Sequence, residues 1–169
     1  MNDPVDKKIL SLYVVFGTLI MFGYGLMVKK YAQNGSYEIW SNQDKNIIMK
    51  NTPVRYAYYV MIVLSFVAGI YLVWYLTTTS KNRTDEILIY TGSVIFLVFS
   101  TVWAFRPLYY SKLVLGMVAV GAVLNLAGIC VNSESETDPF KIGALVASSI
   151  VVLQTGLFDF GIWNGFVRF

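Results

Sequence analysis

Long uncharged runs alternate with short polar segments along the whole chain. The runs occupy residues 9–28, 56–80, 87–105, 113–133 and 142–158. A helix needs roughly 20 apolar residues to cross the hydrocarbon core of a bilayer. The pattern therefore predicts an all-α integral membrane protein, in which about five transmembrane helices form a bundle. We expect a single membrane domain over residues 1–169.

The most informative run is residues 56–80. It carries no charged side chain between Arg55 and Lys81, and both of its ends are rich in tyrosine or tryptophan. Such rings concentrate at the two membrane–water interfaces, which is where the ends of a spanning helix lie. The run 142–158 is at the lower limit of length for spanning. If that run does not span, the bundle has four helices.

The connections between the runs predict how the helices are arranged. The polar segments 81–86 and 106–112 are short, so we expect the second, third and fourth helices to be antiparallel neighbours. The polar loop 29–55 is longer and contains too many apolar side chains for a free linker. The C-terminal tail, residues 159–169, is aromatic and broken by glycine.

Basic residues are distributed unevenly between the two sides of such a bundle. If all five runs span, the loop 29–55, the turn 106–112 and the tail share one side, with eight Lys and Arg against five on the other. Lys and Arg favour the cytoplasmic side of a membrane. We therefore expect the N-terminus outside and the C-terminus inside, while the pattern carries no information on which membrane holds the protein.

Small and polar residues inside the runs predict where helices pack. Small side chains at helical spacing let two backbones approach, and amide side chains then bond across the interface. The packing residues predicted in this way are Ser65, Gly69, Gly121, Asn125, Gly128, Gly143, Ala147 and Gln154. Asp159 follows Thr155 by one α-helical turn, and we interpret it as a helix-end residue at the interface rather than as a gate.

Composition changes the functional picture more than the structural one. Hydrophobic residues make up 56% of the chain and charged residues 14%, and there is no histidine, the commonest general base and metal ligand. Cys130 is the single cysteine and is expected to be a small buried side chain. No phosphate-binding glycine motif is present. We therefore expect no enzyme, with no catalytic, cofactor-binding or metal-binding residues and no small-molecule substrate.

The expected partners are membrane lipids and other protein subunits, not nucleic acid. Basic side chains beside a membrane attract anionic headgroups, and aromatic side chains are enriched in protein interfaces. The predicted partner or lipid contacts are Lys29, Lys30, Trp40, Lys45, Lys50, Tyr109, Tyr110, Trp163, Phe166 and Phe169.

Three features of the chain belong together: the five short-looped runs, the stretch Ala104-Phe105-Arg106-Pro107-Leu108-Tyr109-Tyr110, and the absence of catalytic residues. In these features the chain resembles small multi-pass membrane and minor capsid proteins of large icosahedral DNA viruses. The resemblance implies a structural role that anchors a protein shell to a virion inner membrane. Accessory subunits of respiratory complexes look similar at this level.

We thus expect a structural or anchoring subunit of a larger membrane-associated assembly. The alternative is a small channel or transporter subunit. In that alternative, polar residues within the runs would line the path, and the candidates are Ser100, Asn125, Gln154 and Thr155.

Overall fold

The computed structural model describes residues 6–33, 52–79, 83–105, 111–132 and 137–162. The helices in these ranges are α1 (Lys7–Gln33), α3 (Thr52–Thr78), α4 (Arg83–Phe105), α5 (Ser111–Val131) and α6 (Pro139–Val152), and the π-helix η1 (Leu153–Ile162) continues α6. Within the described residues there are five stretches long and apolar enough to cross a membrane, and there is no β-strand. The predicted all-α bundle of membrane-spanning helices is confirmed.

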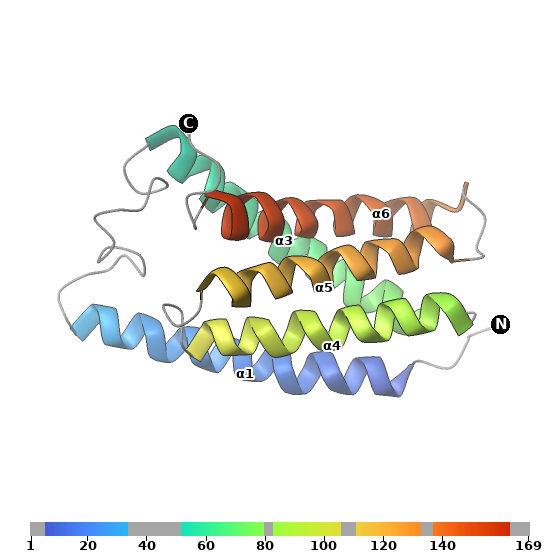
Figure 1. Ribbon diagram of the computed structural model, residues 1–169, viewed down its shortest axis with the longest axis horizontal. Coiled ribbons are helices and arrows are strands. Elements are labelled where there is room, and N and C mark those ends of the chain that lie inside the picture. The colour runs from blue at the N-terminus through green and yellow to red at the C-terminus, as the bar shows by residue number, and fades with distance from the viewer. Residues whose placement is uncertain (1–5, 34–51, 80–82, 106–110, 133–136, 163–169) are drawn as a thin grey trace.

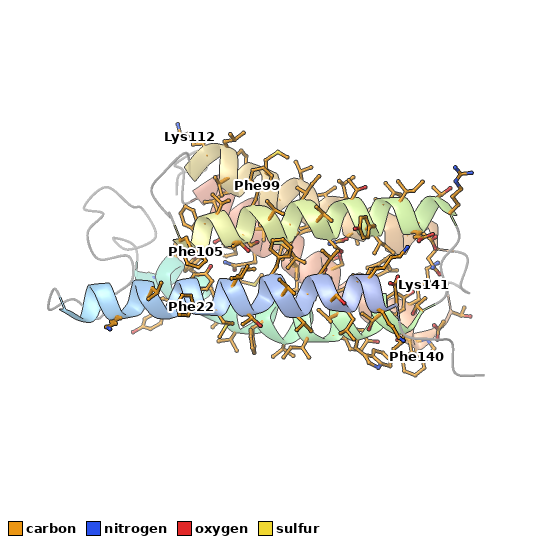
Figure 2. The ribbon with its side chains drawn as sticks, turned by 90° about the horizontal axis from the view of Figure 1, so that it is seen from below. Phe22, Phe99, Phe105, Lys112, Phe140 and Lys141 are labelled. Carbon is orange, nitrogen blue, oxygen red and sulfur yellow. The ribbon has the colours of Figure 1, made fainter. Side chains whose placement is uncertain are left out.

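The helices lie side by side and alternate in direction (Figure 1). α1 and α4 begin at the same end of the bundle, where α3 and α5 end and α6 begins. Figure 2 places Lys141 at this end and Lys112 at the opposite one. We refer to them as the Lys141 end and the Lys112 end.

The order of neighbours around the bundle differs from the order along the chain. α4 lies between α1 and α5, α5 also packs on α6, and α3 packs mainly against α6. The prediction of antiparallel neighbours is confirmed for α4 and α5 but is wrong for α3 and α4, which share no extended contact. A short connection fixes only where one helix ends and the next begins, whereas the fit of side chains selects the face that packs.

The contact between α3 and α6 shows this fit. A Cβ atom added at Gly143 would lie 2.5 Å from the hydroxyl of Tyr71, so a larger residue there would have to displace the tyrosine side chain. The same hydroxyl donates to the carbonyl of Phe140 at 3.1 Å. Trp74 then packs its ring edge-on against Phe140, with centroids 5.5 Å apart.

Two aspartates explain where helices begin. Asp138 has an extended backbone and its carboxylate accepts hydrogen bonds from the amides of Phe140 and Lys141, while Pro139 occupies the first turn of α6. Asp6 accepts in the same way from the amides of Lys8 and Ile9 at the start of α1. Caps of this kind satisfy amides that have no partner inside the helix.

The fifth apolar stretch is longer than the run 142–158. It extends over Pro139–Gly161 because the helical backbone starts at the Asp138 cap and continues through η1. A stretch of 23 residues exceeds the roughly 20 needed for a bilayer core. The bundle therefore has five candidate spans rather than four.

The apolar interior has two parts. The larger lies toward the Lys141 end and includes the fully buried side chains of Ile9, Tyr75 and Ile129. The smaller lies toward the Lys112 end and is centred on Trp103 and Leu115. The outer surface carries many exposed apolar side chains, as expected when hydrocarbon surrounds the helices.

Candidate functional site

Polar side chains between the helices gather in three places. The Asp85 cluster comprises Asp85, Asn132 and Lys141; the Ser93 cluster comprises Tyr13, Ser93 and Asn125; the Asp159 cluster comprises Tyr58, Gln154 and Asp159. Each cluster joins side chains from at least two different helices or helix ends. We consider them in turn from the Lys141 end.

The Asp85 cluster links the start of α4, the end of α5 and the start of α6. The side-chain amide of Asn132 donates to Asp85 Oδ2 at 2.6 Å, and the ammonium group of Lys141 donates to the carbonyl of Asn132 at 2.8 Å. Asp85 is 0% exposed and Lys141 is 3% exposed. A buried charge is tolerated only when it is paired and hydrogen-bonded, so these three residues act as one unit.

The sequence analysis did not single out this unit. Asp85 and Lys141 each stand at the polar border of an apolar run, where charged residues usually face water. Asn132 also lies at the border of an apolar run, but the sequence gives no sign that these three helix ends lie next to one another in space.

The Ser93 cluster joins α1, α4 and α5. The hydroxyl of Ser93 donates to Asn125 Oδ1 at 3.2 Å, and the hydroxyl of Tyr13 lies 3.2 Å from the same serine oxygen. Ser93 and Asn125 are both buried. Asn125, predicted to bond across a helix interface, therefore does so, while Tyr13 and Ser93 were not predicted.

The glycines of α5 allow α4 to approach. A Cβ atom at Gly121 would lie 2.5 Å from the backbone nitrogen of Phe96, and one at Gly128 would lie 2.5 Å from the side chain of Ile89. Gly121 and Gly128 therefore lie at the α4–α5 contact, on the same side of α5 as Asn125. The matching glycine of α4, Gly92, was not predicted, although a Cβ there would lie 2.8 Å from the backbone of Asn125.

The remaining predicted packing residues have mixed outcomes. Gly143 faces α3 through Tyr71, and Ala147 is buried in the apolar cluster that includes Ala68 of α3. The hydroxyl of Ser65 is buried without a hydrogen-bond partner among the described residues. A Cβ atom added at Gly69 would have no neighbouring atom within 4 Å, so the prediction that Gly69 lies at a close helix contact is wrong. Only one face of α3 meets α6, and Gly69 is not on it.

The Asp159 cluster joins α3 to η1 at the Lys112 end. The hydroxyl of Tyr58 donates to Asp159 Oδ1 at 2.9 Å, and the side-chain amide of Gln154 donates to the same oxygen at 3.1 Å. Gln154 was predicted as a packing residue, and its amide bonds to Asp159 within the same helical segment rather than across to another helix.

The π-helix explains why Gln154 and Asp159 meet. In an α-helix, residues five apart are turned by about 140° relative to one another and cannot share a face. In a π-helix the backbone hydrogen bonds join residues five apart, so these residues stack on one face. Asp159 therefore lies over Gln154, and this hydrogen bond was not predicted. Asp159 stands three residues before the end of η1 at Ile162, so its position near a helix end is as predicted, while its place at the interface stays a prediction.

The predicted contact residues lie mostly outside the described part of the chain. Lys29 is exposed on α1; for Lys30, Trp40, Lys45, Lys50, Tyr109, Tyr110, Trp163, Phe166 and Phe169 the side chains are outside the described residues. Cys130 is exposed, so its expected burial is wrong. The neighbouring Ile129 takes the inward position, and the next residue of an α-helix points about 100° away from it.

The five apolar helices and the polar clusters between them define a multi-pass integral membrane protein. No protein family, curated protein or solved structure matches the chain.

Proposed function

We propose that the protein is a non-enzymatic structural subunit that anchors a larger assembly to the membrane it spans, such as a protein shell over a virion inner membrane. The observation that carries this proposal is the use of the interior polar groups. The Asp85 and Ser93 clusters bond helices to one another at two levels, between α1, α4, α5 and α6. Interhelical bonds of this kind hold helices in a fixed relation, which suits a scaffold.

The surface of α1 supports contact with a partner subunit. Only 11% of its membrane-spanning stretch is buried, against 44% for α5. Met21 and Phe22 are 62% and 60% exposed. Because α1 leads into the basic loop 29–55, a protein that binds this loop also comes close to the Lys112 end of α1.

The test is stoichiometric co-purification of the full chain from its own membrane in polymer nanodiscs. We expect a constant set of proteins that stays in fixed ratio to the chain through repeated washing. A photo-crosslinking residue at Met21 should join the chain to one of these subunits. The matched control is Val67 on α3, which is 61% exposed and should give lipid adducts. A stable solitary monomer with no protein adduct at Met21 contradicts the proposal.

A small channel or transporter is the second candidate, and the Asp159 cluster is the observation that favours it. Ionisable residues within membrane-spanning helices commonly mark ion or proton pathways. Purified protein in liposomes should then conduct a cation, and both Asp159→Asn and Gln154→Leu should reduce the flux. Liposomes that pass no cation at all retire this candidate.

A further inference from the structure

The π-helix η1 is unusually long for its type. It covers the 10 residues Leu153–Ile162 at the C-terminal end of the fifth membrane-spanning stretch. π-Helices are rare and occur mostly as single-turn bulges inside α-helices, frequently at functional sites. A π-helix of this length therefore needs side-chain contacts that favour it over continuation of the α-helix α6.

Two sets of contacts favour the π-helical register of η1. Toward α3, Asp159 accepts hydrogen bonds from Tyr58 at 2.9 Å and from Gln154 at 3.1 Å. Toward α5, the ring of Phe160 lies over Gly116, where an added Cβ atom would be 3.1 Å from the ring. Residues five apart share a face in a π-helix, so this register is what brings Asp159 over Gln154.

The same sequence also suits an α-helix. With 3.6 residues per turn, one face of the segment would carry Val151, Thr155 and Phe158. Val151 and Thr155 are already buried in the bundle. In an α-helix Phe158 would therefore follow Thr155 on the buried face, and Asp159 and Phe160 would turn away from their present contacts. The segment thus has two helical registers that each present a plausible inner face.

The π-helical register leaves one polar atom unsatisfied. The side-chain carbonyl oxygen of Gln154 is buried with no hydrogen-bond partner among the described residues, while the amide group of the same side chain is bonded to Asp159. An unsatisfied buried carbonyl is unfavourable. An α-helix places Gln154 and Asp159 on different faces and so releases this side chain from its orientation. The unsatisfied carbonyl therefore offsets part of the stabilisation that the contacts with α3 and α5 provide.

We propose that η1 is a conformational switch with two helical registers. Its contacts with α3 and α5 hold the π-helix, and loss of these contacts converts the segment to an α-helix. The two helix types turn by different angles per residue, so the conversion rotates the C-terminal end of η1 relative to α3 and α5. A partner that binds this end in one orientation favours one register over the other. The inference goes beyond the anchoring role and is tested on the isolated chain, so its failure is distinguishable from a failure to co-purify.

Two glycines report the register directly. In a π-helix the carbonyl of Gly156 accepts from the amide of Gly161, whereas in an α-helix it accepts from the amide of Phe160. The carbonyl carbon of Gly156 lies about 4 Å from the nitrogen of Gly161 in the first case and further away in the second. Solid-state NMR of the full chain in lipid bilayers measures this separation through dipolar dephasing between ¹³C-carbonyl and ¹⁵N labels on glycine. Gly116 and Gly121 are also five residues apart, but they lie in the α-helix α5 and give the α-helical reference.

The signal of Gly156 is assigned by its loss in Gly156→Ala. An added Cβ at this position meets no atom within 4 Å, so the replacement fits the structure. In the wild type we expect the short separation between Gly156 and Gly161 and the longer one between Gly116 and Gly121.

Variants then remove the contacts that hold the π-helix. Tyr58→Phe removes one hydrogen bond to Asp159 and should raise the ratio of the α to the π register by roughly tenfold. Asp159→Leu removes both hydrogen bonds and should make the longer, α-helical separation dominant. The matched control is Tyr71→Phe, which removes a hydroxyl from the same helix at the Lys141 end and should keep the wild-type separation.

Two results overturn the inference. The first is a wild-type separation between Gly156 and Gly161 equal to that of the reference pair in α5, since there is then no π register to leave. The second is a short separation that persists in Asp159→Leu, which shows that the contacts with α3 do not hold the register. If Asp159→Leu does not fold, the comparison of Tyr58→Phe with Tyr71→Phe decides the question, and equal separations in these two variants reject the switch.

Discussion

At the scale of single residues, the space around each glycine decides whether a methyl group is tolerated. Gly121 faces the backbone of Phe96, whereas Gly17 on α1 has no neighbouring atom within 4 Å of an added Cβ. Gly121→Ala forces α4 away from α5 and should lower the free energy of unfolding by about 1–3 kcal/mol, as overpacking does elsewhere. Gly17→Ala is the matched control and should be neutral or slightly stabilising, since alanine favours helix. Unfolding in mixed micelles measures both, and equal effects contradict the packing described.

Buried charges at the Lys141 end lead to a second prediction at this scale. Lys141→Met removes the ammonium group that donates to the carbonyl of Asn132 and leaves this buried carbonyl without that hydrogen bond, which costs about 1–3 kcal/mol. We expect a loss of this order in the free energy of unfolding.

The control for the Lys141 variant is Lys8→Met. Lys8 is exposed at the start of α1, at the same end of the bundle, so its replacement should change stability little. A Lys141→Met variant as stable as Lys8→Met shows that the Asp85 cluster does not hold the helices together.

At the scale of elements, the sequence predicted helix contacts between residues that share one face of a regular α-helix. Gly121 and Asn125 fall on one face of a helix with 3.6 residues per turn, and the structure places that face against α4. Gln154 and Asp159 do not share a face at that period, so an α-helical reading of the sequence could not predict the hydrogen bond between them. The bond forms because the segment is a π-helix. Periodic spacing in a sequence assumes a helix type and fails where the type changes.

Neighbours across the bundle were also beyond the sequence. Tyr71 meets Gly143 although the two residues are 72 positions apart in the sequence. The short connection after α3 had instead predicted α4 as its neighbour. Asp85, Asn132 and Lys141 likewise come together only because three helix ends lie at one level. Such meetings depend on the three-dimensional arrangement, of which one sequence gives only the element boundaries.

Cross-linking tests the neighbour order directly. In a Cys130→Ser background, Tyr71→Cys with Gly143→Cys should be joined by a short bismaleimide, because the two positions face each other across α3 and α6. Tyr71→Cys with Tyr90→Cys tests the arrangement that chain order suggests, with α4 beside α3. Tyr90 is exposed, so its thiol would be accessible. Efficient cross-linking of the second pair and not the first contradicts the observed order.

At the scale of the whole molecule, the alternation of helices fixes which ends share a side. We expect the Lys141 end to be outside and the Lys112 end to be cytoplasmic, from the distribution of Lys and Arg. In a Cys130→Ser background, Thr137→Cys should react with an impermeant maleimide added to intact cells. Lys112→Cys should react only after the membrane is opened; both residues are exposed, so access to the reagent decides the result. The reverse labelling pattern contradicts the orientation.

The packing of α1 against α4 and of α3 against α6 also sets the order in which helix contacts can form during synthesis. A ribosome makes α1 and α3 first, but their main neighbours emerge only later, and the neighbour of α3 emerges last. Both early helices must therefore wait in lipid or beside the insertion machinery before they find their places. A chain halted before residue 139 contains four apolar helices yet leaves α3 without its principal contact, so α3 gains its main packing partner only when α6 has been made.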